Sequence, residues 1–201
     1  SDLGRLLWSH RDAARYDNPI GGIGPRATPT VVGNQVFTLG STGRLNALEL
    51  ATGKAQWTHD LVAETGAKIP DWGYAGSPLV LEGRVIVSAG GKAKQSLLAF
   101  RADTGERLWA AGDAEAGYGS PFVATLAGRR QILAYNHRRI TAHDAAGAQA
   151  SVTGGIDLVL AVPAAPAVTA PAAGLITEQS ALTVTGTANP EARVRVMRGG
   201  D

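Results

Sequence analysis

The sequence predicts an all-β fold: about three four-stranded antiparallel blades of a β-propeller in an open arc, followed by a short β-rich fragment. Two observations lead to this prediction. A unit of alternating apolar and polar residues, with a polar turn and a closing tryptophan, occupies residues 45–57 and returns at residues 97–109. The tryptophans Trp8, Trp57 and Trp109 follow one another at intervals of about fifty residues, a period that is typical of propeller blades.

The composition fits a globular chain without thiol chemistry. Of the 201 residues, 44% are hydrophobic and 18% are charged, which is typical of a folded rather than a disordered chain. There is no cysteine, so disulfides, thiol nucleophiles and cysteine-bound metals are excluded. A net charge of +2 gives no support for a nucleic-acid partner, and no apolar run reaches the roughly eighteen residues that a membrane helix needs.

The first blade is predicted from turns of about two to four residues between β-rich segments, because such short turns force antiparallel hairpins. Its strands are expected at residues 30–32, 36–39, 45–50 and 55–61. Apolar and polar residues alternate only approximately along them, as expected for strands sandwiched between neighbouring blades. Residues 5–10 are expected to form the last strand of a preceding unit.

The second and third blades repeat this pattern. Strands of the second are expected at residues 78–81, 84–89, 96–101 and 107–111, and strands of the third at 122–126, 131–135 and 139–143. A last strand of the third blade should follow residue 147, but no tryptophan closes it. Because propellers have roughly four to eight blades, three blades predict an incomplete ring. The connections at residues 62–76 and 112–119 are expected to contain no helix.

The composition changes near residue 152. We therefore expect propeller blades over residues 1–150, a Pro/Ala-rich linker over 151–174 and a β-rich segment over 175–201. Within the last segment, residues 181–188 and 192–197 alternate as two strands joined by a short turn.

The repeat -LxALxxxTGxxxW- resembles the PQQ-like β-propeller repeat of quinoprotein dehydrogenases and of BamB-type outer-membrane assembly lipoproteins. The resemblance rests on Leu45, Ala47, Leu48, Thr52, Gly53 and Trp57, and again on Leu97, Ala99, Phe100, Thr104, Gly105 and Trp109. It implies a periplasmic or secreted protein in which the tryptophans dock against the next blade. The expected docking residues are Trp8, Trp57, Trp109, Gly53 and Gly105.

The C-terminal segment is similar to the start of bacterial Ig-like repeats of surface proteins. The matching residues are Val184, Gly186, Ala188, Pro190, Val194 and Val196. Only the first strands of such a repeat are present, so this part could not close a sandwich alone.

Catalysis finds little support in the sequence. Quinoprotein dehydrogenases, by resemblance, use a catalytic aspartate, a calcium ion and a disulfide between adjacent cysteines, whereas this chain has no cysteine and no acid that matches those positions. The four histidines, His10, His59, His137 and His143, lack the spacing of metal ligands. We therefore predict no catalytic residue, no metal site and no cofactor; PQQ and calcium enter only under the alternative of a remnant dehydrogenase.

The connections that lead into the first strand of each blade are the most promising place for a ligand. Arg26, Trp72, Tyr74 and Tyr118 lie on them and are expected to cluster at one mouth of the channel. Aromatic rings with an arginine suit a peptide, a sugar or a quinone. The alternative is that these side chains pack between blades.

The preferred hypothesis is a non-catalytic, extracytoplasmic scaffold or interaction surface for a protein or small-molecule ligand. A remnant of a PQQ-dependent alcohol dehydrogenase and an adhesin-like surface protein with an Ig-like stalk are the alternatives. Self-association through open blade edges is also expected, since unpaired edges and exposed blade faces promote it.

Overall fold

In a computed structural model of the chain, the described residues are 6–19, 21–126, 128–136, 139–144, 167–170 and 185–187. The chain forms two compact units, residues 1–159 and 160–201. In the second unit, β14 (Ala167–Ala170) pairs antiparallel with β15 (Thr185–Thr187). Most of the expected Ig-like strands and the last strand of the third blade lie outside the described residues, and the predicted boundaries at 150 and 174 stay a prediction.

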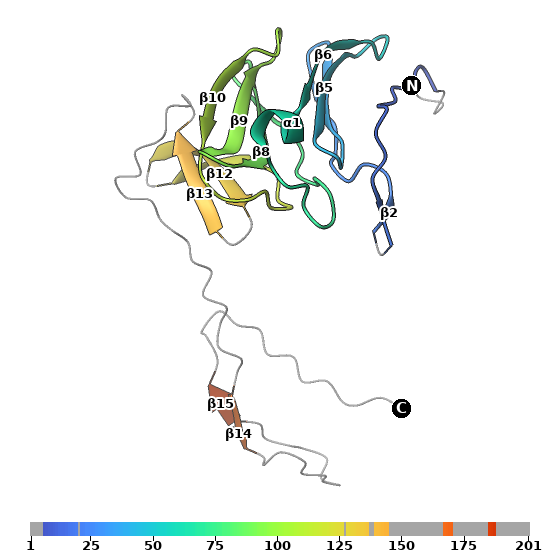
Figure 1. The fold of residues 1–201 in the computed structure, drawn as a ribbon. Helices are drawn as coiled ribbons and strands as arrows, with labels where there is room; N and C mark the ends of the chain where they lie inside the picture. Colours follow the sequence, from blue (N-terminus) through green and yellow to red (C-terminus); the bar gives the residue numbers. More distant parts are fainter. Residues whose placement is uncertain are drawn as a thin grey trace. The chain divides into compact units, whose positions relative to one another are not determined.

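Three larger antiparallel sheets make up most of the described part of the first unit, each with its strands in chain order (Figure 1). The first sheet consists of β3 (Thr30–Val32), β4 (Gln35–Leu39), β5 (Arg44–Glu49) and β6 (Ala55–Asp60). The second consists of β7 (Leu79–Leu81), β8 (Arg84–Gly91), β9 (Gln95–Arg101) and β10 (Arg107–Ala111), and the third of β11 (Phe122–Leu126), β12 (Arg129–Asn136) and β13 (Arg139–Asp144).

These positions confirm the predicted fold class. The strand ends differ from the expected ones by at most about two residues, which is the usual uncertainty of element boundaries. The sheets lie side by side as an arc that does not close (Figure 1), so the fold is a partial propeller. Among the described residues, no helix has the length and apolar character to cross a membrane.

The second sheet is covered on both faces, and its side chains alternate between two cores. One core joins it to the first sheet and includes Phe37, Leu45, Val85, Val87, Leu98 and Phe100. The other joins it to the third sheet and includes Ile86, Leu97, Ala99, Ile132 and Ala134. The blurred alternation seen in the sequence therefore follows from burial on both faces.

Two expectations were wrong. Residues 6–16 form no strand, because they are held by side-chain contacts rather than by a ladder: the Trp8 indole donates to the Leu50 carbonyl, and Asp12 accepts from Asn46. The connection after β6 begins with a one-turn helix, α1 (Leu61–Thr65), where the sequence predicted only strand and loop. A second small element, the hairpin of β1 (Asp17–Asn18) and β2 (Gly22–Ile23), was also not expected.

The repeated Thr-Gly turns have the same geometry in the first two sheets. Gly53 and Gly105 have φ of 70° and 76°, a left-handed conformation that glycine adopts without strain. Each donates its N–H to the carbonyl four residues earlier, on Glu49 and Arg101 respectively. Each also has a tryptophan against its Cα, so an added methyl group would meet the ring: Trp8 at Gly53 and Trp57 at Gly105.

Candidate functional site

A groove of about 650 Å³ lies where the connections between sheets meet. Its walls are formed by residues 66–71, by Gly90 and Lys92 of the β8–β9 region, and by residues 115–118. Tyr135 of β12 completes the lining. We call this feature the connection groove.

Helix α1 fixes the first wall. Asp60 caps its start by accepting the Ala63 N–H at 3.0 Å, and Gly66 ends it in a left-handed conformation with φ of 64°. Leu61 is fully buried, and Thr65 packs so closely on Gly91 of β8 that a Cβ there would lie 2.5 Å from the Thr65 Cβ. The helix therefore packs the start of the connection against the second sheet and positions residues 66–71 along the groove.

Tyr74 anchors the end of the same connection. Its side chain is 1% exposed, and its hydroxyl donates to the Ala89 carbonyl at 2.8 Å. Burial, and to a smaller extent the charge of Asp60, raises the pKa of Tyr74 to about 12. The ring also lies so close to Gly43 that a Cβ there would be 3.0 Å from it. Tyr74 thus joins the first and second sheets.

The second wall depends on close backbone approach. A Cβ on Gly90 would clash with the backbone nitrogen of Ala116, and a Cβ on Gly76 would lie 2.7 Å from the Gly119 carbonyl oxygen. Hydroxyl groups join the successive connections: Ser77 Oγ accepts the Thr28 N–H, and Ser120 Oγ accepts the Ser77 N–H, both at 2.9 Å. This bonding explains why a serine precedes proline in the second and third connections, at Ser77 and Ser120.

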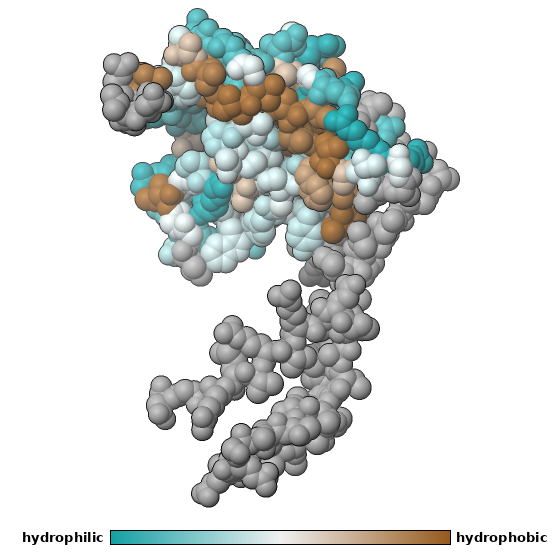
Figure 2. Space-filling view, turned by 180° about the vertical axis from the view of Figure 1, so that it is seen from behind, coloured by the Kyte–Doolittle hydropathy of each residue, from teal (hydrophilic) through white to brown (hydrophobic). Residues whose placement is uncertain are grey.

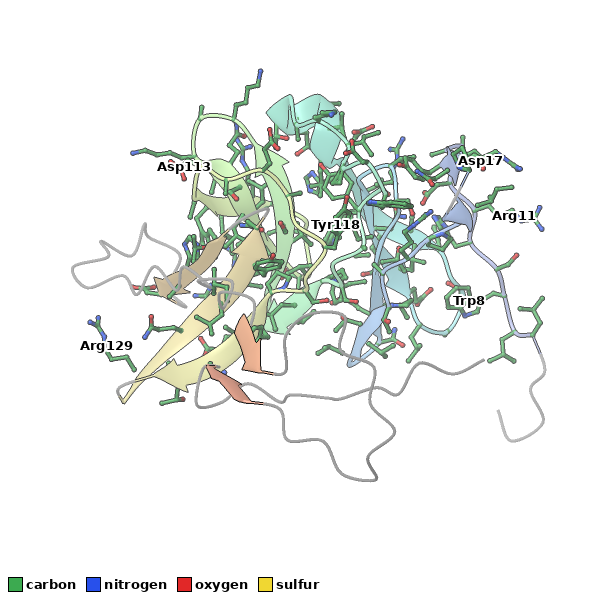
Figure 3. All side chains as sticks on the ribbon, turned by 90° about the horizontal axis from the view of Figure 1, so that it is seen from below. Trp8, Arg11, Asp17, Asp113, Tyr118 and Arg129 are labelled. Carbon is green, nitrogen blue, oxygen red and sulfur yellow. The ribbon has the colours of Figure 1, made fainter. Side chains whose placement is uncertain are left out.

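The groove presents both charged and aromatic groups. Lys68 and Asp71 form an exposed ion pair at 3.5 Å, and Lys92 and Glu115 add one charge of each sign. Tyr118, labelled in Figure 3, is 45% exposed, and Tyr135 is 42% exposed. Exposed rings with both charge signs nearby suit a polar ligand that also offers apolar surface, such as a peptide segment.

The structure does not bring the four expected ligand residues into one pocket. Of these, Tyr118 alone lines the connection groove, and Tyr74 lies in the core. Arg26 donates to the carbonyls of Gly22 and Gly24 and lies 5.2 Å from the Tyr16 ring centroid, so it holds the β1–β2 hairpin.

Trp72 is 40% exposed but does not line the groove. The binding role of these four positions stays a prediction.

Two of the expected docking tryptophans, Trp57 and Trp109, lie between sheets, and Trp8 lies on the outer face of the first sheet. Trp57 donates its indole N–H to the Ala102 carbonyl at 2.9 Å, and Trp8 donates to Leu50 at 2.8 Å, although Trp8 is in no strand. Trp109 packs against the core between the second and third sheets, but its buried N–H finds no acceptor among the described residues.

Several groove residues were missed at the level of sequence. Lys68 and Lys92 had no pattern that distinguished them from other surface lysines. Tyr135 lies within a predicted strand, so nothing indicated that its ring would face an open groove. Tyr118 and the choice of the connections pointed to this region, and the length of the 62–76 connection is a further signal, because long loops in compact folds are frequently functional.

The described part of the chain can be compared with the ligand sets that metal ions need. No group of three His, Asp or Glu there could hold a metal ion, so a ligand set for calcium is not found among those residues. The two groups with shifted pKa values, Tyr74 and His143, are buried and do not line the groove. A second, smaller pocket of about 360 Å³ lies between residues 10–16 and the 40–42 loop.

Comparison with known proteins gives one family and several structures. Residues 1–157 match the family model described as outer membrane protein assembly factor BamB. No curated protein matches the chain.

Among solved structures, a quinohemoprotein alcohol dehydrogenase from Pseudomonas putida HK5 is 27% identical over 72% of this chain and 21% of its own, with a TM-score of 0.47. BamB from Moraxella catarrhalis is 17% identical over 62% of this chain and 48% of its own, with a TM-score of 0.29. The chain thus spans about a fifth of that dehydrogenase and about half of that BamB.

Proposed function

The chain belongs to the family described as outer membrane protein assembly factor BamB, and we propose that it is a non-catalytic interaction module that holds a segment of a partner protein in the connection groove. Its place of action, by the same proposal, is outside the cytoplasm at the outer membrane that the family name indicates. The groove is the observation that supports this proposal.

The shape and lining of the groove favour a peptide over a small substrate. Its volume of about 650 Å³ is partly open to solvent, and glycines and alanines on both connections contribute to its lining. Backbone groups can bond an extended peptide, while Tyr118 and Tyr135 offer rings that lose little conformational entropy on binding. The lysines and acids at the rim would set the orientation of the bound segment through charge.

The surface outside the groove also favours protein association. Figure 2 shows a hydrophobic band across the face seen from behind. Large apolar side chains are exposed on the first strand of the first sheet, at Val31 (55%) and Val32 (48%) of β3. Exposed apolar patches of this kind mark interaction surfaces.

A remnant of a PQQ-dependent dehydrogenase is the alternative enzyme function. Such an enzyme needs a set of calcium ligands near the quinone, and no cluster of three His, Asp or Glu that could hold a metal ion is found among the described residues. Addition of PQQ and calcium, followed by measurement of dye reduction with an alcohol, tests this alternative. Sustained turnover would overturn the non-catalytic proposal.

The proposed binding is tested with an array of synthetic extended peptides of mixed charge and aromatic content. Binding of the array to the wild-type chain is compared with binding to a Tyr118→Ala/Tyr135→Ala variant. The matched control is Phe122→Ala, which removes a similarly exposed ring that does not line the groove.

We expect at least about a tenfold loss of affinity for the double variant and an unchanged affinity for the control, because clustered aromatic contacts dominate such interfaces. An equal loss in both variants would contradict the placement of the site. A Trp72→Ala variant would show whether the predicted binding role of Trp72 extends the site along the connection.

A further inference from the structure

The outer face of the first sheet, which faces away from the second sheet, is covered by the chain's own residues 8–12 (Figure 3 labels Trp8 there). This segment forms neither helix nor strand, so it contributes no ladder hydrogen bonds. Its contacts with the sheet are those of side chains, as a short peptide ligand would make.

The first anchor is the Trp8 indole. Its N–H donates to the Leu50 carbonyl at 2.8 Å, and its ring lies directly on Gly53, where an added Cβ would clash with it. Gly53 and the Leu50 carbonyl thus hold the indole together. The equivalent positions of the second sheet, Gly105 and the Ala102 carbonyl, hold Trp57 in the same way.

The second anchor is the Asp12 carboxylate, four residues after Trp8. Asn46 is 1% exposed and donates its amide to both carboxylate oxygens, at 3.0 and 3.2 Å. The Asn46 amide is held in place by Thr58, whose hydroxyl donates to its oxygen at 2.8 Å. His10 lies 3.3 Å from the same carboxylate.

Comparison with the second sheet shows that this face is suited to a polar ligand. Thr38, Asn46 and Thr58 are cross-strand neighbours on β4, β5 and β6. Their equivalents in the second sheet, by strand register, are Val87, Leu98 and Ala110. Those three pack into the apolar core against the first sheet. The first sheet therefore carries an amide and two hydroxyls where a sheet-to-sheet joint carries hydrocarbon.

We propose that the outer face of the first sheet is a peptide-binding site, separate from the connection groove, for an extended segment that carries a tryptophan and, four residues later, a carboxylate. Residues 8–12 occupy it in the same chain, and a segment of another protein with this pattern competes for it. Because the resident segment is tethered, its effective concentration is on the order of millimolar, so a free peptide binds the intact chain weakly.

The test uses the full chain with Trp8→Ala and Asp12→Ala, which removes both anchors of the resident segment. A fluorescein-labelled synthetic peptide of residues 6–16 is titrated and followed by fluorescence polarisation. We expect saturable binding to this double variant, and at least about tenfold weaker binding to the wild-type chain, whose own segment fills the site. A peptide with alanine at both anchor positions should bind at least about tenfold more weakly than the native peptide.

A substitution in the first sheet itself distinguishes specific binding of the peptide from non-specific adhesion. Asn46→Leu, added to the double variant, introduces the residue type that the second sheet has at the equivalent position, Leu98, and is therefore compatible with the fold. It should abolish binding of the native peptide. If the double variant does not fold, the same titrations are made with the single Asp12→Ala variant, whose Trp8 contact is intact.

Equal binding of the native and the alanine peptide, binding that survives Asn46→Leu, or no binding by a folded variant at millimolar peptide would each overturn the proposal. The Tyr118→Ala/Tyr135→Ala change should leave this titration unaltered. A result that contradicts the site on the first sheet is therefore distinct from one that contradicts peptide binding in the connection groove.

Discussion

The two joints between sheets use the same repeat but different chemistry. The first joint is aromatic: the rings of Phe37, Trp57, His59 and Phe100 contact one another, and Trp57 and His59 both bond to carbonyls of the turn in the second sheet. The second joint has smaller apolar residues and a buried polar network. In it, Ser88 donates to Asn136 at 2.6 Å, and Asn136 donates to Ser96 at 2.8 Å.

The closing tryptophans show the same difference. Trp57 has an acceptor for its N–H, whereas the buried N–H of Trp109 has none among the described residues. An unpaired buried donor costs free energy, so the Trp109 indole stabilises the second joint less than the Trp57 indole stabilises the first. One repeat can therefore join sheets through ring packing in one place and through hydrogen bonds in another, and the first joint should be the stronger.

The largest expected effect is the loss of the Trp57 ring. Trp57→Ala should lower the free energy of unfolding by about 3 kcal/mol, since it removes ring packing and a hydrogen bond. Trp109→Ala should cost about 1 kcal/mol less, because the unpaired N–H disappears with the ring. Urea unfolding followed by circular dichroism measures both values, with the exposed Trp72→Ala as control. An equal or greater cost for Trp109→Ala would contradict the ranking of the joints.

The next effect concerns the polar network of the second joint. Asn136→Ala should destabilise the chain by about 2 kcal/mol, because it leaves two buried hydroxyls without their partner. A triple variant, Ser88→Ala with Ser96→Ala and Asn136→Leu, should recover most of this loss, since it leaves no unpaired polar group. Chemical unfolding of both variants checks this expectation; a triple variant weaker than the single one would show that the network is required for more than satisfied hydrogen bonding.

At high pH the first joint should weaken through Tyr74. Its pKa is raised from 10.0 to about 12, mainly by burial, so the unfolded chain releases the phenol proton first. The Tyr74 contribution to stability is therefore constant below pH 10 and is lost as the pH rises from 10 to 12. Unfolding midpoints measured across this range should fall more steeply for the wild-type chain than for Tyr74→Phe. Parallel pH curves would contradict the assignment.

At low pH the second joint should weaken through His143. Burial lowers the pKa of His143 below 6.5, so the unfolded chain binds the proton more readily than the folded chain. The His143 contribution is present above pH 6.5 and is lost as the pH falls below that value. We expect His143→Gln to flatten this part of the stability curve while Tyr74→Phe leaves it unchanged, a difference that thermal melts at successive pH values would detect.

Much of the fold could be predicted from the sequence because the residues that form its turns are recognisable locally. The Thr-Gly turns at Gly53 and Gly105 need a left-handed residue, and their spacing fixed the hairpins and the blade period. Helix α1 was missed because Leu61 continues the apolar pattern of β6, while the signals that start and end the helix, Asp60 and Gly66, lie within a segment that also resembles a loop.

The site was harder to predict because it depends on contacts between distant residues. Tyr74 and Tyr118 occupy similar places in two connections, yet Tyr74 is buried between sheets and Tyr118 is exposed in the groove. Thr28 and Ser77 each precede a proline, but the bond from the Thr28 N–H to the Ser77 hydroxyl appears only when the connections are placed beside one another. Such differences arise from packing and not from local propensity.

The most direct test of unequal joints is native-state hydrogen exchange of the full chain, read by mass spectrometry over peptides from β4, β9 and β12. Since each sheet depends on its neighbours for burial, the weaker joint should open first. The structure predicts that amides of β12 exchange at a lower opening free energy than those of β4 and β9, which should exchange together. Protection of β12 equal to or greater than that of β4 and β9 would contradict the ranking of the two joints.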